Sequence, residues 1–299
     1  MLWDKIIGQE HAVEILKQSV HAKRVSSAYL FFGPKGVGKG TTAEVVAKAV
    51  NCPYQGCDSC HVCVRINKKN YPDVKEISAD GSFIKIGQIR EIIKEVSLSV
   101  FEAQYRVYIL KEVEKMKAEA ANAFLKILEE PSQNTIFILT TNAIDSLHST
   151  IVSRCQLIRF NLLSPQNEEK ILREKGMSQE ESSFLTNISA GRPGKAIEYK
   201  EKEAGKYLSM IQGYMEEILK SKNKIRIFSF AEEAKKYSAD IEIILDIIIW
   251  IIPDFFSANT GNRARNEVLK VKSQIARNIN LQLGLEVMLF RLVDINAIQ

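Results

Sequence analysis

The sequence predicts an α/β domain with a parallel sheet covered by helices on both faces, followed by two regions made only of helices. Two observations predict this class. Before Phe160, short apolar runs rich in β-branched and aromatic residues alternate with segments of helical periodicity. After Phe160 only helical patterns follow, with turn signals at Gly176 and Gly191.

The elements of the α/β domain are predicted in alternating order. An amphipathic helix opens after Gly8, and an apolar strand at 28–32 leads through a glycine-rich loop into a helix at 41–51. Further strands are expected at 73–77, 105–110, 135–142 and 156–160. Further helices are expected at 86–99, at 118–130 before Pro131, and near 147–155.

Composition and length are those of an ordinary globular protein. The chain has 299 residues, of which 26% are charged and 45% hydrophobic, so two or three compact units are expected. The net charge of +5 permits an anionic partner such as DNA but does not require one.

No segment predicts secretion or a membrane span. The N-terminus lacks an apolar core of signal length. The most apolar stretch, 241–256, is interrupted by Glu242, Asp246 and Pro253, and its longest pure run is far shorter than the ~20 residues that span a bilayer. We therefore expect a buried helix there, and a cytoplasmic protein with no membrane contact.

The glycine-rich loop "GPKGVGKGTT" follows a strand and opens a helix, as a phosphate-binding loop does. Its glycines let backbone N–H groups turn toward phosphates, and its lysine would reach the terminal phosphates. Gly40 stands where the usual pattern has a Ser or Thr that holds Mg²⁺, although a hydroxyl follows one place later, as in adenylate kinases. The candidate nucleotide-binding residues are Gly33, Gly36, Gly38, Lys39 and Thr41, and the loop by itself leaves nucleotide binding open.

The strand "VYILKEVEKM" carries the second half of such a site, where an acidic pair positions Mg²⁺ and polarises water. Here the pair is Lys111-Glu112, so a cation stands where the metal-binding acid belongs. A unit charge roughly 4 Å from Mg²⁺ costs on the order of 8 kcal/mol at an effective dielectric near 20. Together with Gly40, this substitution argues against ATP hydrolysis by the chain itself.

Four of the five cysteines lie in one C-x₄-C-x₂-C-x₂-C cluster. In a reducing compartment such clustering indicates a metal site rather than disulfides, with free buried thiols as the alternative. Four thiolates suit a tetrahedral, structural Zn²⁺ and leave no open coordination position for catalysis. The candidate ligands are Cys52, Cys57, Cys60 and Cys63.

Together the motifs resemble one family, the AAA+ subunits of bacterial clamp loaders. They cover nearly all of the first 200 residues in the family's order: "IIGQEHAV", "SSAYLFFGPKGVGKGTTA", the cysteines, "YRVYILKEVEKMKAEAANAFLKILEEP", "ILTTN", "STIVSRCQLIRF" and "SAGRPGKA". The resemblance implies an AAA+ P-loop domain at 1–162 with a zinc module at 52–63, a helical lid domain at 163–206 and a helical collar, or oligomerisation, domain at 207–299. Clamp-loader subunits generally have a longer gap after the first cysteine, so His61 is an alternative to Cys52 as the fourth ligand.

Within this family, Lys111-Glu112 and "GRPGKA" resemble the delta-prime class of DNA polymerase III subunits. The tau/gamma class would carry Asp-Glu and a loop that ends in Ser or Thr. The resemblance implies a non-hydrolysing structural subunit of the polymerase holoenzyme, able at most to hold ATP or ADP. Its partners would be the tau/gamma and delta subunits and, through the complex, the sliding clamp (beta) and primer-template DNA.

The resemblance also assigns roles to two short motifs. Ser153-Arg154-Cys155 would make Arg154 an arginine finger, acting in trans on the ATP of a neighbouring subunit. Such an arginine can be worth ~10³–10⁵ in rate. Thr141 and Asn142 would occupy the family's first sensor position, and Arg192 in "GRPGKA" is left without a role.

Three other readings compete with this one. The chain could be an ATP-hydrolysing tau/gamma-type motor, against which Lys111 and Gly40 speak, or a nucleotide kinase of the adenylate kinase type, which would not need a long helical C-terminal region. The chain could also be a zinc-dependent DNA-binding module, but its sequence shows no recognition helix.

Five basic residues gather in the C-terminal region. A solvated helix face is the expected explanation, with contact to DNA or a partner as the alternative; the residues are Arg263, Arg265, Lys270, Lys272 and Arg277.

Overall fold

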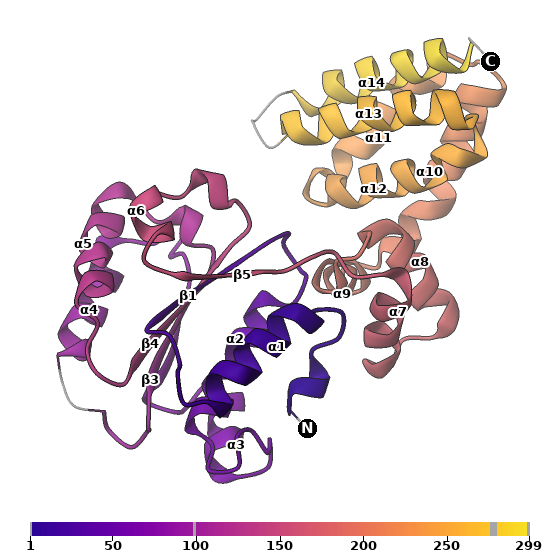
Figure 1. The fold of residues 1–299 in the computed structure, drawn as a ribbon. Helices are drawn as coiled ribbons and strands as arrows, with labels where there is room; N and C mark the ends of the chain where they lie inside the picture. Colours follow the sequence, from indigo (N-terminus) through magenta and orange to yellow (C-terminus); the bar gives the residue numbers. More distant parts are fainter. Residues whose placement is uncertain (1, 98–99, 276–279, 298–299) are drawn as a thin grey trace. The chain divides into compact units, whose positions relative to one another are not determined.

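The computed structural model describes residues 2–97, 100–275 and 280–297 (Figure 1). The chain forms two compact units. The first comprises Met1–Ile171 with Gly191–Gly194, and the second comprises Leu172–Ala190 with Lys195–Gln299. Each unit has its own hydrophobic core.

The first unit is built on a sheet of five parallel strands in the order β2-β3-β4-β1-β5. The register places Tyr29 of β1 opposite Ile138 of β4 and Gln156 of β5. All five strands fall where the apolar runs predict them: β1 (Ala28–Phe32), β2 (Val74–Ile77), β3 (Arg106–Leu110), β4 (Thr135–Thr141) and β5 (Gln156–Arg159).

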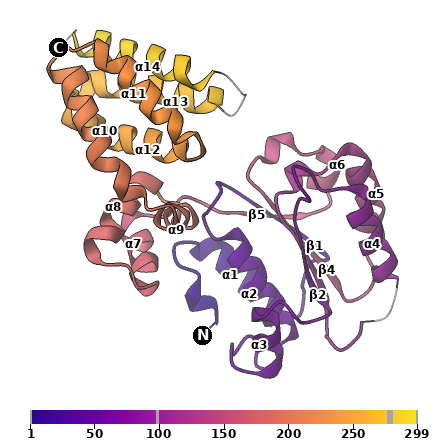
Figure 2. The same ribbon diagram turned by 180° about the vertical axis from the view of Figure 1, so that it is seen from behind.

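Helices cover both faces of this sheet, as predicted (Figures 1 and 2). The helices are α1 (Glu10–His21), α2 (Lys39–Asn51), α3 (His61–Asn67), α4 (Ile86–Val96), α5 (Ala118–Glu129) and α6 (Ser149–Val152). Successive strand residues point to opposite faces, so Tyr29 and Phe31 pack with α1 and α2, whereas Leu30 packs with α4 and α5. Short 3₁₀ turns lie at Leu2–Lys5, Val113–Lys115 and Ile144–Ser146.

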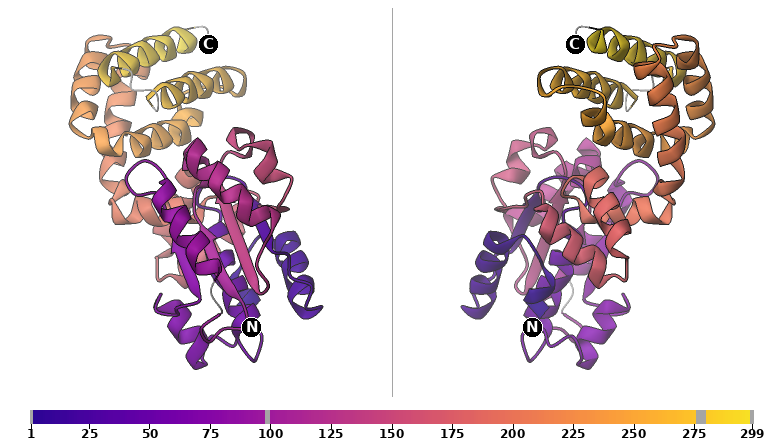
Figure 3. Two further views of the ribbon diagram at one scale, coloured as in Figure 1. Left: turned by 90° about the vertical axis from the view of Figure 1, so that its left-hand side faces the viewer. Right: turned by 90° about the vertical axis from the view of Figure 1, so that its right-hand side faces the viewer.

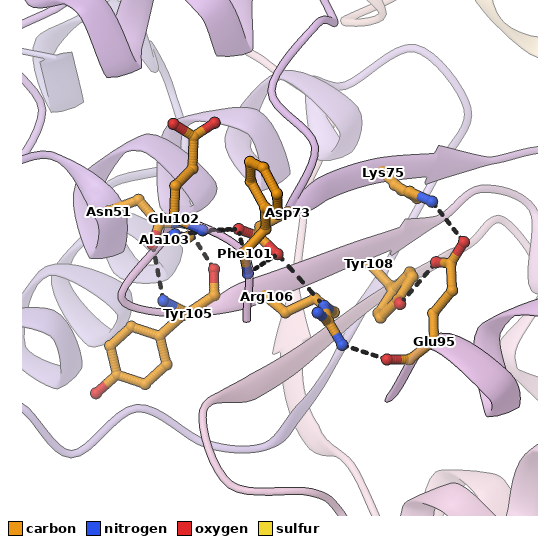
Figure 4. Close-up of polar contacts among 10 residues, drawn as sticks. All are labelled: Asn51, Asp73, Lys75, Glu95, Phe101, Glu102, Ala103, Tyr105, Arg106 and Tyr108. Carbon is orange, nitrogen blue, oxygen red and sulfur yellow. Dashed lines mark hydrogen bonds and ion pairs between the residues drawn. The ribbon is translucent and has the colours of Figure 1, made fainter. Parts of the chain in front are cut away.

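A buried polar network holds the segment between α4 and β3 (Figure 4). The Asp73 carboxylate, 2% exposed, accepts hydrogen bonds of 2.9–3.1 Å from the backbone N–H groups of Phe101, Glu102 and Ala103. It also pairs with the Arg106 guanidinium at 3.5 Å. One buried carboxylate therefore fixes the chain as it enters the sheet.

The helices after the sheet agree with the predicted helical regions. They are α7 (Pro165–Glu174), α8 (Gln179–Ser189), α9 (Pro193–Glu201), α10 (Leu208–Met215), α11 (Ile225–Lys236), α12 (Ile241–Ile251), α13 (Ala258–Ile275) and α14 (Leu281–Asn296). A π-helical turn lies at Glu216–Lys220, and 3₁₀ turns lie at Ala204–Tyr207, Ser238–Asp240 and Ile252–Asp254. Among the described residues no strand follows Arg159.

One hydrophobic core runs through the whole second unit. It joins Leu172, Leu185 and Tyr199 to side chains of the later helices, such as Phe230 and Leu289. Helices α10 to α14 pack against one another in this unit (Figure 3). The predicted lid at 163–206 and collar at 207–299 therefore share a core, and their boundary stays a proposal.

The most apolar stretch forms α12, as expected, and most of its residues are buried. Its Asp246, 6% exposed, is paired with Lys195 and Lys272 at 2.5 Å each and accepts a hydrogen bond of 2.6 Å from the Tyr199 hydroxyl. In the part of the chain that the structure describes, no helix is long and apolar enough to cross a bilayer.

Candidate functional site

The glycine-rich loop lies at the carboxyl end of β1 and leads directly into α2, as the strand–loop–helix pattern predicts. Gly33 has a φ of +145°, and a Cβ atom there would lie 2.2 Å from the backbone oxygen of Phe160. Gly38 caps α2 with a φ of +99°. Only glycine can occupy position 33, so the loop keeps the close backbone packing of a phosphate-binding turn.

Lys39 turns its amine toward the loop itself. Its Nζ atom donates to the backbone oxygens of Gly33 and Pro34 at 2.7 and 2.6 Å, and to Oδ1 of Asn142 at 3.0 Å. Burial lowers the pKa of Lys39 to about 8, although the carboxylates of Glu114 and Glu112 oppose the shift. A phosphate at this loop would have to draw the amine away from three oxygen acceptors.

The two hydroxyls that follow Gly40 differ in their surroundings. Thr41, the candidate replacement for the missing Mg²⁺ hydroxyl, is exposed on α2. Thr42 is fully buried and donates its hydroxyl to the backbone oxygen of Gly38 at 3.0 Å. The buried hydroxyl thus supports the first turn of the helix.

The two positions that lack a magnesium ligand lie next to each other. A Cβ atom at Gly40 would be 3.7 Å from Cε of Lys111, so the lysine stem lies over the start of α2. The Lys111 amine pairs with Glu76 at 2.9 Å, and Glu76 also pairs with Lys69 at 2.8 Å. An ammonium group therefore stands beside the position where the usual motif brings a hydroxyl and a carboxylate to the metal.

Asn142, at the end of β4, links Lys39 to two carboxylates. Its Nδ2 atom donates to Glu114 at 2.9 Å and to Glu112 at 3.4 Å, and its backbone N–H donates to Glu114 at 3.2 Å. Glu112 also pairs with Lys115 at 2.6 Å, and this contact lowers the pKa of Glu112. The second acid of the pair is thus present but already engaged, and Glu114, which the motif pattern did not indicate, belongs to the same network.

The "GRPGKA" segment packs directly on the loop. The backbone N–H of Gly194 donates to the oxygen of Gly36 at 2.8 Å, and a Cβ atom at Gly194 would lie 2.9 Å from Cα of Gly36. The backbone N–H of Gly191 donates a hydrogen bond of 2.7 Å to the Glu168 carboxylate. This hydrogen bond anchors the start of the segment. No pattern in the sequence indicates that Gly194 and Gly36 are in contact.

Arg154 lies on the surface just after α6, with its side chain 34% exposed. Its guanidinium donates to the Glu129 carboxylate at 2.7 Å and to the backbone oxygen of Thr150 at 3.0 Å. The neighbouring Cys155 is different, because burial raises the pKa of its thiol to about 12. Of the three residues in the Ser-Arg-Cys motif, Arg154 is the one with a cationic side chain, and it is exposed.

The four clustered cysteines come together, and their Sγ atoms all lie within 4.8 Å of one another. Cys52 is 3.7 Å from Cys57 and 3.6 Å from Cys60, close to the ~3.8 Å edge of a tetrahedron with 2.3 Å metal–sulfur bonds. Cys52 is therefore part of the group, whereas His61 is exposed on α3 and is not. The donor set fits a tetrahedral metal such as zinc.

Neighbouring groups fix the cysteine module to the first unit. Backbone N–H groups of Tyr54 and Cys57 point at the sulfur of Cys52, and Cys60 donates its backbone N–H to the sulfur of Cys57 at 3.2 Å. Asp58 pairs with Lys48 of α2 at 2.9 Å and also with Lys5. The module is thus held in place by its backbone and by ion pairs.

Ion pairs account for part of the C-terminal basic group. Lys270 pairs with Glu267 at 2.5 Å, and Lys272 pairs with Asp246. Arg263 and Arg265 are exposed on α13. Arg277 lies outside the described residues.

Comparisons with known proteins identify the family of the chain. Residues 8–164 match the family described as "DNA polymerase III, delta subunit". The DNA polymerase III subunit delta' of Bacillus subtilis is 33% identical over 262 residues, which is 85% of this chain and 79% of the relative. The tau subunit of the same organism is 36% identical over 200 residues, but these residues are only 35% of its length.

The fold has relatives among solved structures as well. A structure of Thermotoga maritima RuvB superposes with a TM-score of 0.50 at 18% identity, covering 70% of this chain and 65% of the other. This likeness supports the AAA+ architecture alone. The family match and the sequence relatives show that the chain belongs to the clamp-loader AAA+ family, as a subunit of DNA polymerase III.

Proposed function

We propose that this chain is a delta-prime-type clamp-loader subunit, which does not hydrolyse ATP and supplies Arg154 in trans to a neighbouring ATPase subunit. The observation that carries the proposal is Lys111, which lies against Gly40 where magnesium would need two ligands. The match to a delta' protein over 85% of the chain supports the same class.

The loop can be retained without hydrolysis because its groups have other partners. Lys39 is engaged by three oxygens, and Glu112 by Lys115 and Asn142. Gly33, Gly36, Gly38 and Lys39 would still allow ATP or ADP to be held. Without a magnesium hydroxyl and carboxylate, such a nucleotide would stay intact.

Arg154 is suited to the proposed role because it is an exposed cation next to the parallel sheet of an AAA+ domain. A guanidinium can stabilise the charge that develops on a transferring phosphoryl group. The partners would be the tau/gamma and delta subunits, with the sliding clamp and primer-template DNA reached through the complex in the cytoplasm. Structural zinc would hold the cysteine module. The second unit would contain the collar (207–299) and most of the lid (163–206), while residues 163–171 and 191–194 of the lid belong to the first unit.

An assay of the purified chain alone tests whether its own nucleotide site hydrolyses ATP. We expect no magnesium-dependent release of phosphate from ATP above a blank, with a purified tau subunit as the positive control. Turnover by the purified chain would overturn the proposal.

The proposed finger requires a reconstituted loader containing the tau/gamma and delta subunits. Arg154→Ala should leave assembly intact and lower DNA-stimulated ATP hydrolysis, since one neighbouring site would lose an effect worth ~10³-fold or more. Arg159→Ala, an exposed arginine on β5, is the matched control. Equal turnover for the wild type and the Arg154 variant would remove Arg154 from the mechanism.

A second candidate is an ATP-hydrolysing tau/gamma-type motor. It is favoured by the retained Lys39, Glu112 and Asn142 and by the 36% identity to a tau subunit. The same ATPase measurement on the purified chain separates the two functions.

A further inference from the structure

Arg154 has two fixed contacts that its proposed role does not explain. One is the carboxylate of Glu129, and the other is the backbone oxygen of Thr150. A guanidinium has five N–H donors, so these two contacts leave three donors for another ligand. The two contacts orient the Arg154 side chain and leave N–H donors of its guanidinium available.

Both contacts come from helices that pack in one core of the first unit. Glu129 is the last residue of α5, and Thr150 belongs to α6. The two helices share one core, which contains Leu128 of α5 and Ile151 of α6. Carbonyls in the last turn of a helix lack a backbone donor within the helix, and the oxygen of Thr150 accepts the Ser153 hydroxyl at 3.2 Å as well as the Arg154 guanidinium.

The Glu129–Arg154 pair is too exposed to matter much for folding. Glu129 is 51% and Arg154 34% exposed, and exposed ion pairs contribute little to stability. A flexible arginine loses rotamer freedom when it binds phosphate, however, and an arginine already held in one orientation loses less. The pair therefore has its largest effect on the orientation of the guanidinium.

We infer that Glu129 is a positioning residue, which holds the Arg154 guanidinium so that its remaining N–H groups meet a phosphate of the neighbouring subunit. This inference rests on the proposed role of Arg154. The opposite role, in which the carboxylate competes with phosphate for the arginine, is disfavoured because three donors remain beyond the two contacts and because an exposed pair is weak.

The test uses the reconstituted loader with four single variants of this chain and one double variant. Glu129→Ala should lower kcat for DNA-stimulated ATP hydrolysis by about two- to five-fold, which is less than the loss that Arg154→Ala causes, with KM for ATP unchanged. Glu129→Gln should restore most of the rate, because its amide oxygen can still accept a hydrogen bond from the guanidinium. Glu130→Ala changes the adjacent exposed glutamate and should leave the rate at the wild-type value.

Two results would overturn the inference. Equal rates for the Glu129→Ala and Glu130→Ala loaders would show that Glu129 does not act on the arginine, and a faster Glu129→Ala loader would show that it competes with phosphate. The Glu129→Ala change should have no further effect in an Arg154→Ala background, and an additional loss there would also contradict it. An unchanged rate for Arg154→Ala itself is a different result, because it removes the proposed finger rather than its positioning.

Discussion

At the scale of single residues, two substitutions decide how the nucleotide loop is interpreted. Gly40 removes a hydroxyl and Lys111 removes a carboxylate, and the structure places the lysine stem 3.7 Å from the Cβ position of the glycine. A hydroxyl-bearing side chain at position 40 would contact this stem. The two changes therefore fit each other, and both work against a bound Mg²⁺.

Gly194 provides a prediction at the same scale. Gly194→Ala should lower the free energy of unfolding by about 1–3 kcal/mol, because a Cβ atom would lie 2.9 Å from Cα of Gly36. Gly213→Ala is the matched control: its Cβ meets nothing within 4 Å on α10, so it should raise stability by about 0.5–1 kcal/mol. Urea unfolding of both variants checks this, and a neutral Gly194→Ala would contradict the close approach.

At the scale of elements, the cysteine module gives a prediction about metal content. The wild-type chain should bind one zinc ion, and Cys60→Ser should lose it, because three thiolates leave the tetrahedral set incomplete. Cys155→Ser and His61→Ala should both keep the metal, since neither residue belongs to the cluster. Elemental analysis of the purified variants measures the ratio. Loss of zinc in the His61 variant, or its retention without Cys60, would contradict the assignment.

The Asp73 network gives a second prediction for elements. Asp73→Ala should destabilise the first unit by about 3–5 kcal/mol, because it removes the carboxylate partner of a buried guanidinium and the acceptor of three backbone N–H groups. Asp80→Ala, which removes an exposed partner of Lys85, is the control and should change stability little. Denaturant unfolding followed by circular dichroism measures both, and similar losses would show that the network is not a major support.

The same aspartate makes stability depend on pH. Burial by itself raises the pKa of Asp73, but the N–H groups of Glu102, Phe101 and Ala103 outweigh it, so the pKa falls below 3.8. A lowered carboxyl pKa contributes stability that is present above the unfolded value and lost as the pH falls through the folded value. The stability gap between the wild type and Asp73→Asn should therefore be largest near neutral pH and shrink below about pH 4. A gap that grows on acidification would contradict this.

Elements were predicted better than contacts. The alternation of apolar runs and helical periods was enough to place the five strands, since each depends on local pattern. The meeting of Gly36 with Gly194, and of Arg154 with Glu129, joins residues far apart in the chain, and no local pattern encodes such a contact. The place of Glu114 in the network around Asn142 could have been predicted, because it is an acidic residue only two positions after Glu112. Whether Cys52 or His61 is the fourth metal ligand could be decided only from the positions of the four sulfur atoms.

At the scale of the whole molecule, two proposed tasks fall on different segments of one chain. The nucleotide loop keeps its fold through its glycines and through the contacts of Lys39. The catalytic contribution would come from Arg154, on a different segment of the same unit. A family member without its own reaction could in this way still be needed for the reaction of its neighbour.

The most direct test compares two variants in the same reconstituted loader. Lys39→Met alters the loop's own lysine, and Arg154→Ala removes the proposed finger, with assembly and melting temperature checked for both. We predict that DNA-stimulated ATP hydrolysis falls for Arg154→Ala and stays at the wild-type rate for Lys39→Met. A fall for Lys39→Met with an unchanged rate for Arg154→Ala would contradict the account, because it would place the working site at this chain's own loop.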